Sequence, residues 1–177
     1  MDSAIKISDV LPIELFWEIQ DDLEYWKNSN YSMEGTCSFL GRSGADELVF
    51  NKAQGIIKLK MQKYIEHHLM PVRIHLNAAF PNQKASVFHT DFDETNMLTF
   101  ILYTTPAWNT QWGGETVVKL PEGGYQYIEY VPNNGSFFPS HWEHYGASPN
   151  AHCESMRTSV AFTYEICYNS PIVKNTL

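Results

Sequence analysis

The chain has 177 residues and a formal net charge of −8, with only 12 lysines and arginines. A length near the common domain size suits one hydrophobic core, so we expect a single domain over residues 1–177. A surface that follows a phosphate backbone needs clustered basic residues, so this composition argues against a DNA or RNA partner.

The start of the chain and its apolar runs bear on location. Residues 1–9, MDSAIKISD, contain neither the basic region nor the apolar stretch of a secretory signal. No apolar run approaches the roughly 20 residues of a membrane span. Cys37, Cys153 and Cys167 are odd in number and form no C-x-x-C pair, which is typical of reduced thiols. We therefore expect a cytoplasmic protein without a membrane segment.

Residues 9–70 carry helical patterns. Between residues 11 and 27, apolar side chains recur at helical spacing, at Phe16, Ile19, Leu23 and Trp26. Asp9 is a candidate cap for this helix, and Pro12 suits its first turn. A second helical pattern covers residues 46–69 and stops before Pro71, since the residue before a proline disfavours the helical conformation. We expect these two helices to support the rest of the domain.

Beyond Pro71 the chain consists of short runs rich in β-branched and aromatic residues. These runs cover residues 72–76, 97–103, 115–118, 125–131, 136–138 and 157–166, and glycine- or asparagine-containing turns separate them. Antiparallel strands must hide their edges, and a jelly roll of two sheets does so at this length. The sequence therefore predicts a mainly β protein with N-terminal helices and a jelly-roll core over residues 72–167.

A histidine and an aspartate stand one residue apart in His89-Thr90-Asp91. In an extended segment, residues i and i+2 point to the same face, so both side chains can reach one ion. An imidazole and a carboxylate are two members of the 2-His-1-carboxylate set that holds non-haem Fe(II). A polar strand end would explain the pair as well, and both His141 and His144 lie downstream as candidates for the missing histidine.

Several motifs follow one another in a fixed order. They are His89-Thr90-Asp91, the run ending at Tyr103, Gly113-Gly114-Glu115-Thr116, the segment PNNGSFFP at 132–139, His144 and Arg157. Together they resemble the Fe(II)- and 2-oxoglutarate-dependent dioxygenases, within them the prolyl 4-hydroxylase-like branch. The resemblance implies a double-stranded β-helix core and hydroxylation of an unactivated C–H bond. It also implies Fe(II) as the metal, 2-oxoglutarate as co-substrate and ascorbate as a helpful reductant.

The resemblance also implies roles for individual residues. His89, Asp91 and His144 would ligate iron. Arg157 would bind the distal carboxylate of 2-oxoglutarate, because its planar fork of donors matches a planar pair of acceptors. Tyr103 and Ser159 could touch the same co-substrate, although packing alone would also explain a tyrosine or a small residue at these positions.

The position of the second histidine stays open. The segment between His144 and Arg157 is somewhat longer than is usual in the family, so His141 and His152 are alternatives to His144. We prefer His144 because it begins an extended run, His144-Tyr145-Gly146, whereas His141 follows Pro139-Ser140 closely. The histidines that fit no motif position are expected on the surface or in the core: His67, His68, His75 and His152.

The resemblance implies a peptidyl proline, within a peptide or protein partner, as the substrate. Residues 31–45 and 105–112 could shape the mouth of the site, and Trp108 and Trp112 could stack on a proline ring or instead cap the barrel. A free amino acid or another small molecule is the alternative substrate. The rival functions are a non-catalytic jelly-roll binding domain and a Zn- or Mn-dependent cupin-type enzyme, and Arg157 counts against both.

Overall fold

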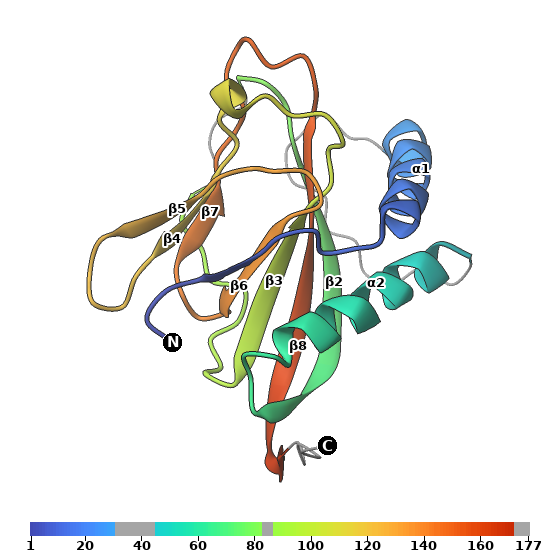
Figure 1. Cartoon of the computed structure of the whole chain (residues 1–177). Helices are drawn as coiled ribbons and strands as arrows, with labels where there is room; N and C mark the ends of the chain where they lie inside the picture. Colours follow the sequence, from blue (N-terminus) through green and yellow to red (C-terminus); the bar gives the residue numbers. More distant parts are fainter. Residues whose placement is uncertain (31–44, 83–86, 172–177) are drawn as a thin grey trace.

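The computed structural model describes residues 1–30, 45–82 and 87–171 (Figure 1). Helices α1 (Ile13–Asn30) and α2 (Ala45–Met61) are followed by most of the strands, and a short 3-10 helix lies at Thr110–Trp112. The strands are β1 (Ile5–Ile7), β2 (His67–Ala79), β3 (Met97–Tyr103), β4 (Thr116–Lys119), β5 (Tyr125–Ile128), β6 (Gly135–Pro139), β7 (His144–Gly146) and β8 (Arg157–Pro171). In the described part of the chain, no helix has the length and apolarity that crossing a membrane requires.

The strands form two antiparallel sheets. The larger has the order β1-β6-β3-β8-β2, and the smaller has the order β5-β4-β7. The smaller sheet lies on one side of the larger sheet, and α1 and α2 lie on the other (Figure 1). This arrangement confirms the predicted mainly β fold with N-terminal helices and a jelly-roll core.

Strand β3 separates two hydrophobic cores, because all of its residues are buried. Its even-numbered residues, such as Phe100, belong to the cluster packed under the helices with Phe16 and Ile57. Its odd-numbered residues, such as Ile101 and Tyr103, belong to the cluster between the two sheets. Because successive side chains of a strand point to opposite faces, one face of β3 packs under the helices and the other faces the space between the sheets.

Strand β1 was not predicted from the sequence. It pairs with β6 at the edge of the larger sheet. The chain that follows is held by Asn133, whose side-chain oxygen accepts from the Leu11 amide at 3.0 Å and whose side-chain nitrogen donates to the Leu11 carbonyl at 2.9 Å. A strand of three residues gives too little periodicity to recognise, and its pairing depends on a segment far along the chain.

The structure corrects the predicted end of the second helix and the predicted cap of the first helix. The second helix ends at Met61 rather than at residue 69, and His67–Ala79 form β2. The apolar side chains of Ile65 and Leu69 still face the core under the helices, so they fit the helical spacing without being helical. Asp9 is not the cap of the first helix: it has φ 47, and Pro12, which accepts from the Phe16 amide, directly precedes the first helical residue.

Candidate active site

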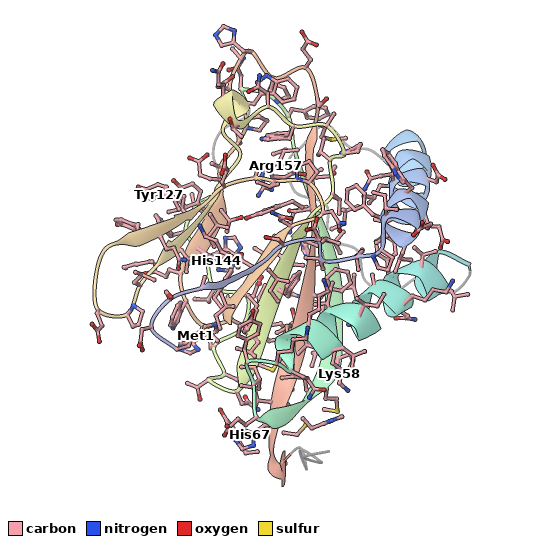
Figure 2. All side chains as sticks on the ribbon, in the orientation of Figure 1. Met1, Lys58, His67, Tyr127, His144 and Arg157 are labelled. Atoms are coloured by element: carbon pink, nitrogen blue, oxygen red, sulfur yellow. The ribbon has the colours of Figure 1, made fainter. Side chains whose placement is uncertain are left out.

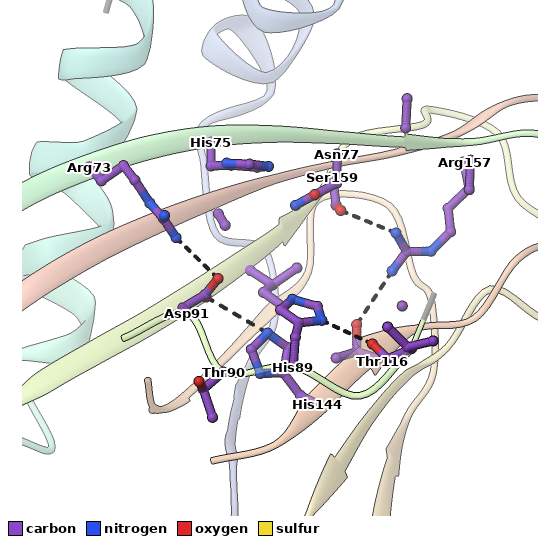
Figure 3. A pocket seen from close by; sticks show the side chains of 16 residues that line it. Arg73, His75, Asn77, His89, Thr90, Asp91, Thr116, His144, Arg157 and Ser159 are labelled. Atoms are coloured by element: carbon purple, nitrogen blue, oxygen red, sulfur yellow. Dashed lines mark hydrogen bonds and ion pairs between the residues drawn. The ribbon is translucent and has the colours of Figure 1, made fainter. Parts of the chain in front are cut away.

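A pocket of about 540 Å³ opens between the sheets. Figure 3 shows its lining side chains, and Figure 2 shows His144 and Arg157 in the space between the two sheets. The polar residues that line it are Arg73, His75, Asn77, His89, Thr90, Asp91, Thr116, His144, Arg157 and Ser159. Strands β2, β3, β4, β7 and β8 all contribute, so the pocket is a product of the complete two-sheet arrangement.

His89, Asp91 and His144 form a cluster whose ligand atoms all lie within 4.8 Å of one another. The backbones of His89 and His144 pair directly: the His89 amide donates to the His144 carbonyl at 3.1 Å, and the reverse bond is 2.9 Å. This isolated bridge sets the two imidazole rings side by side, with centroids 4.5 Å apart. No other cluster of this kind occurs in the described ranges 1–30, 45–82 and 87–171.

Both imidazoles are held in one tautomer. Nδ1 of His89 lies 3.1 Å from the Val87 carbonyl, and Nδ1 of His144 lies 3.0 Å from the Trp142 carbonyl. Because a carbonyl only accepts, each Nδ1 carries the proton and donates it, which leaves each Nε2 with a free lone pair. Burial lowers the pKa of His144, and the neighbouring Asp91 carboxylate opposes this only in part. The neutral ring that a metal requires is therefore favoured.

The carboxylate of Asp91 is fixed at both oxygens. Its Oδ1 accepts from Arg73 Nη2 at 3.0 Å, and its Oδ2 accepts from Thr99 Oγ1 at 2.7 Å. Oδ2 also lies 3.7 Å from Nε2 of His144. The oxygen Oδ2 therefore faces the second histidine, whereas Oδ1 is turned towards β2.

Arg157 lies at another part of the same pocket and is only 4% exposed. Its Nε donates to the Gly114 carbonyl at 2.7 Å, and its terminal nitrogens donate to Ser159 Oγ at 3.2 Å and Thr116 Oγ1 at 3.4 Å. Within the described residues no carboxylate pairs with this guanidinium. A buried cation without an anion is costly, so this arrangement is suited to an anionic ligand.

The Gly113-Gly114-Glu115-Thr116 turn shapes the surroundings of Arg157. Gly114 has φ +81, and a Cβ there would lie 2.6 Å from Cζ2 of Trp108. Only glycine therefore lets the turn approach closely enough for its carbonyl to accept from Arg157. Thr116, at the end of the turn, lines the pocket and accepts from both Arg157 and Tyr103.

Tyr103, which was predicted to touch the co-substrate, lies just behind the pocket wall. Its hydroxyl donates to Thr116 Oγ1 at 2.9 Å, and its ring centroid lies 5.8 Å from Cζ of Arg157. Ser159 lines the pocket directly. Arg157, Ser159 and Tyr103 thus lie close together, with Thr116 between the tyrosine and the pocket.

The two tryptophans predicted for the mouth of the site pack against other aromatic side chains. Trp108 packs on Tyr130 with centroids 4.2 Å apart and on Trp112 at 5.4 Å, and its Nε1 donates to the Gly113 carbonyl. Neither tryptophan is among the described residues that line the pocket, so their contact with substrate stays a prediction. The other predicted mouth segment is residues 31–45, of which 31–44 lie outside the described residues.

The alternatives for the second histidine lie outside the cluster. The structure brings His144, and neither His141 nor His152, together with His89 and Asp91. His152 is exposed in the long connection between β7 and β8. The long segment between His144 and Arg157 was the reason to consider His141 and His152, and His144 lies in the cluster despite this length.

Sequence reasoning missed one wall of the pocket. Arg73, His75 and Asn77 on β2 all line it, and burial together with the Arg73 charge lowers the pKa of His75. The signal was present in the sequence, because polar residues alternate with apolar ones along Val72-Arg73-Ile74-His75-Leu76. Without a motif at these positions, His75 was assigned to the surface or core.

No family model and no curated protein matches this sequence. Solved structures match its fold. A Pseudomonas putida prolyl-4-hydroxylase has a TM-score of 0.65 and 15% identity over 94% of each chain. A Trichoplax adhaerens prolyl hydroxylase in complex with a peptide fragment of the hypoxia inducible factor oxygen degradation domain has a TM-score of 0.73 and 14% identity, covering 94% of this chain and 84% of that one.

A third match is HygX from Streptomyces hygroscopicus, a structure with nickel and 2-oxoglutarate bound. It has a TM-score of 0.70 and 9% identity, covering 93% of this chain and 83% of that one. At such identities the likeness is one of fold. The resemblance found in the ordered motifs is confirmed at that level: this chain has the fold of prolyl 4-hydroxylases and other 2-oxoglutarate-dependent oxygenases.

Proposed function

We propose that this protein is an Fe(II)- and 2-oxoglutarate-dependent dioxygenase that hydroxylates an unactivated C–H bond, consuming O2 and releasing succinate and CO2. One observation carries the proposal: a His-Asp-His cluster and a buried guanidinium without an anionic partner among the described residues line the same pocket (Figure 3). A metal site alone would not need the guanidinium, and an anion site alone would not need the cluster.

The residues of the cluster fit Fe(II). His89 and His144 would bind it through Nε2, which the Nδ1 bonds leave free, and Asp91 through Oδ2, which lies 3.7 Å from Nε2 of His144. Two imidazoles and one carboxylate form the donor set that such enzymes use, with the opposite side of the metal open. When bound, Fe(II) and 2-oxoglutarate supply the oxidative chemistry, and the protein supplies binding, orientation and the exclusion of water.

Arg157 would bind the distal carboxylate of 2-oxoglutarate. Its charge has no counter-ion in the described chain, and the hydroxyls of Thr116 and Ser159 beside it can donate to the same carboxylate. Tyr103 would act through Thr116, by donating to the hydroxyl oxygen and so directing its proton towards the pocket. Gly146 leaves the space that the guanidinium occupies, since a Cβ there would lie 3.2 Å from Nη1.

For the substrate we infer a proline within a peptide or protein. The support is the fold shared with two prolyl hydroxylases, one of which is in complex with a peptide fragment. A second candidate is a small polar metabolite such as a free amino acid. It is favoured by the β2 wall of Arg73, His75 and Asn77, and by the absence of any phenylalanine, tyrosine or tryptophan among the described residues that line the pocket.

The test is turnover with Fe(II), ascorbate and 2-oxoglutarate against a library of proline-containing peptides and, separately, free amino acids and nucleosides. The expected result is succinate release coupled to the gain of one oxygen atom by a peptide. The Asp91→Ala variant, which removes a proposed metal ligand, serves as the inactive control. Oxygen gain by a non-peptide alone would contradict the proposed peptide substrate but not the proposed dioxygenase activity. Absence of succinate with every substrate would count against the dioxygenase activity itself.

A further inference from the structure

We infer that Arg73 is a positioning residue that restrains the Asp91 carboxylate, so that one oxygen only, Oδ2, is presented to the metal. The inference rests on the proposed function, because it concerns the same metal site. It assigns a role to a residue of β2 that belongs to none of the ordered motifs.

The contact is a charge-assisted hydrogen bond in a partly buried position. Arg73 Nη2 donates to Asp91 Oδ1 at 3.0 Å, and the two side chains are 27% and 14% exposed. Cζ of Arg73 also lies 4.8 Å from the ring centroid of Phe92, which stacks against the guanidinium. Partial burial weakens solvent screening, so this pair holds its geometry better than a surface ion pair would.

The other oxygen of Asp91 is restrained independently. Thr99 Oγ1 lies 2.7 Å from Oδ2 and 2.9 Å from Ser140 Oγ, and the Asp91 amide donates to the Ser140 carbonyl at 3.0 Å. Rotation of the carboxylate about its own axis would break the bonds from Arg73 and Thr99 together. The two oxygens therefore stay in these positions: Oδ2 faces His144, and Oδ1 accepts from Arg73.

The chemical consequence concerns the number of open positions on the metal. A carboxylate that binds through both oxygens takes up a second coordination position, and this position is then lost to the co-substrate or to O2. Because Arg73 donates to Oδ1, the carboxylate would bind a metal through Oδ2 alone. Removing a hydrogen-bond partner of a metal ligand typically lowers metal affinity or activity by about 10- to 100-fold.

The test compares Arg73→Met, which keeps an unbranched, mainly apolar stem but removes the donors, with Arg73→Lys, which keeps the charge and one donor group. Lys119→Met is the matched control, since it removes the ion pair with Glu143 on the surface, outside the pocket. Each protein is loaded with Co(II) without oxygen. Two quantities are measured: the visible absorption spectrum, which reports coordination, and the affinity for 2-oxoglutarate by calorimetry.

Arg73→Met is expected to change the Co(II) spectrum and to weaken 2-oxoglutarate binding by roughly 10-fold or more, while Lys119→Met leaves both unchanged. Arg73→Lys is expected to restore the spectrum in part, which a purely structural role would not produce. If Arg73→Met has the spectrum and the affinity of the unaltered protein, this inference is overturned but the proposed function is not. If the unaltered protein bound neither Co(II) nor 2-oxoglutarate, the proposed function would fall with it. Should Arg73→Met not fold, Arg73→Lys decides through the same two measurements.

Discussion

Among the described residues, Arg157 donates to neutral oxygen atoms and pairs with no carboxylate. Its guanidinium Cζ lies 5.8 Å from the ring centroid of Tyr103 and 5.3 Å from that of Tyr130. Burial raises the pKa of both phenols, although the Arg157 charge acts in the opposite direction. The phenols therefore stay neutral and cannot balance the charge, which leaves that role to a ligand.

Replacing Arg157 with lysine should weaken 2-oxoglutarate binding to the metal-loaded protein by roughly 10- to 100-fold, because charge-assisted bonds of the guanidinium fork are lost. Metal affinity should stay near that of the unaltered protein, since Arg157 contacts none of the three ligands. Calorimetry with metal and with 2-oxoglutarate measures both quantities. Unchanged co-substrate affinity would assign the anchor to another group.

The three candidate second histidines can be separated by metal binding. His144→Ala should lower Fe(II) affinity strongly, because it removes a ligand atom of the cluster. His141→Ala and His152→Ala should bind Fe(II) as the unaltered protein does, and they serve as matched controls with the same substitution. Loss of metal in either control, with retention in His144→Ala, would show that the cluster is not the metal site.

At the scale of elements, the turn before β4 holds the surroundings of Arg157 in place. It carries Gly114, whose carbonyl accepts from Arg157, and Thr116, which accepts from Tyr103. Its form could be recognised from the sequence as a Gly-Gly turn. Its function could not, because Arg157 reaches it only after β8 has paired with β3.

Gly114→Ala should destabilise the protein by about 1–3 kcal/mol and should also weaken 2-oxoglutarate binding. The added Cβ meets Trp108 at 2.6 Å in addition to the strain at φ +81. Gly123→Ala is the matched control: it has φ +97 and nothing within 4 Å, so it adds strain without a clash. Thermal unfolding and calorimetry check both effects, and equal co-substrate affinity in the two variants would speak against the role of the turn.

Sequence patterns located the elements better than their ends. The prediction for β3 was correct to the residue, because an apolar run interrupted only by Thr99 and bounded by polar segments leaves few alternatives. The end of α2 was misplaced, since Ile65 and Leu69 continue the apolar spacing from a turn and a strand. The identity of the second histidine depended on the backbone bridge between His89 and His144, a pairing that no local pattern encodes.

At the scale of the whole molecule, the larger sheet serves both stability and site. Its helical side holds the core of Phe16, Ile57 and Phe162, and its other side carries the pocket. Titratable groups face the pocket from both sheets, and burial lowers the pKa of His75 on β2 and of His144 on β7. The stability of the metal-free protein should therefore depend on pH through the histidines of the pocket.

The metal-free protein should lose stability as the pH falls below 6.5, the ordinary histidine pKa. Below that value the unfolded chain binds protons that the folded chain resists. Where the unfolded state binds more protons, stability decreases as the pH falls. The loss should level off once the pH passes the lowered pKa values of the folded state. Urea unfolding at neutral pH and below 6.5 measures it, and His75→Gln should flatten the dependence; an identical pH dependence in that variant would exclude His75 as a contributor.

The most direct test of the account is whether metal and 2-oxoglutarate bind to one pocket. Calorimetric titration of 2-oxoglutarate into the protein, without oxygen, is carried out with and without Fe(II), and repeated with Asp91→Ala and with Arg157→Met. We expect one co-substrate site that needs Fe(II) and is severely weakened in both variants. Binding of 2-oxoglutarate that is independent of Fe(II), or that survives both substitutions, would contradict the account.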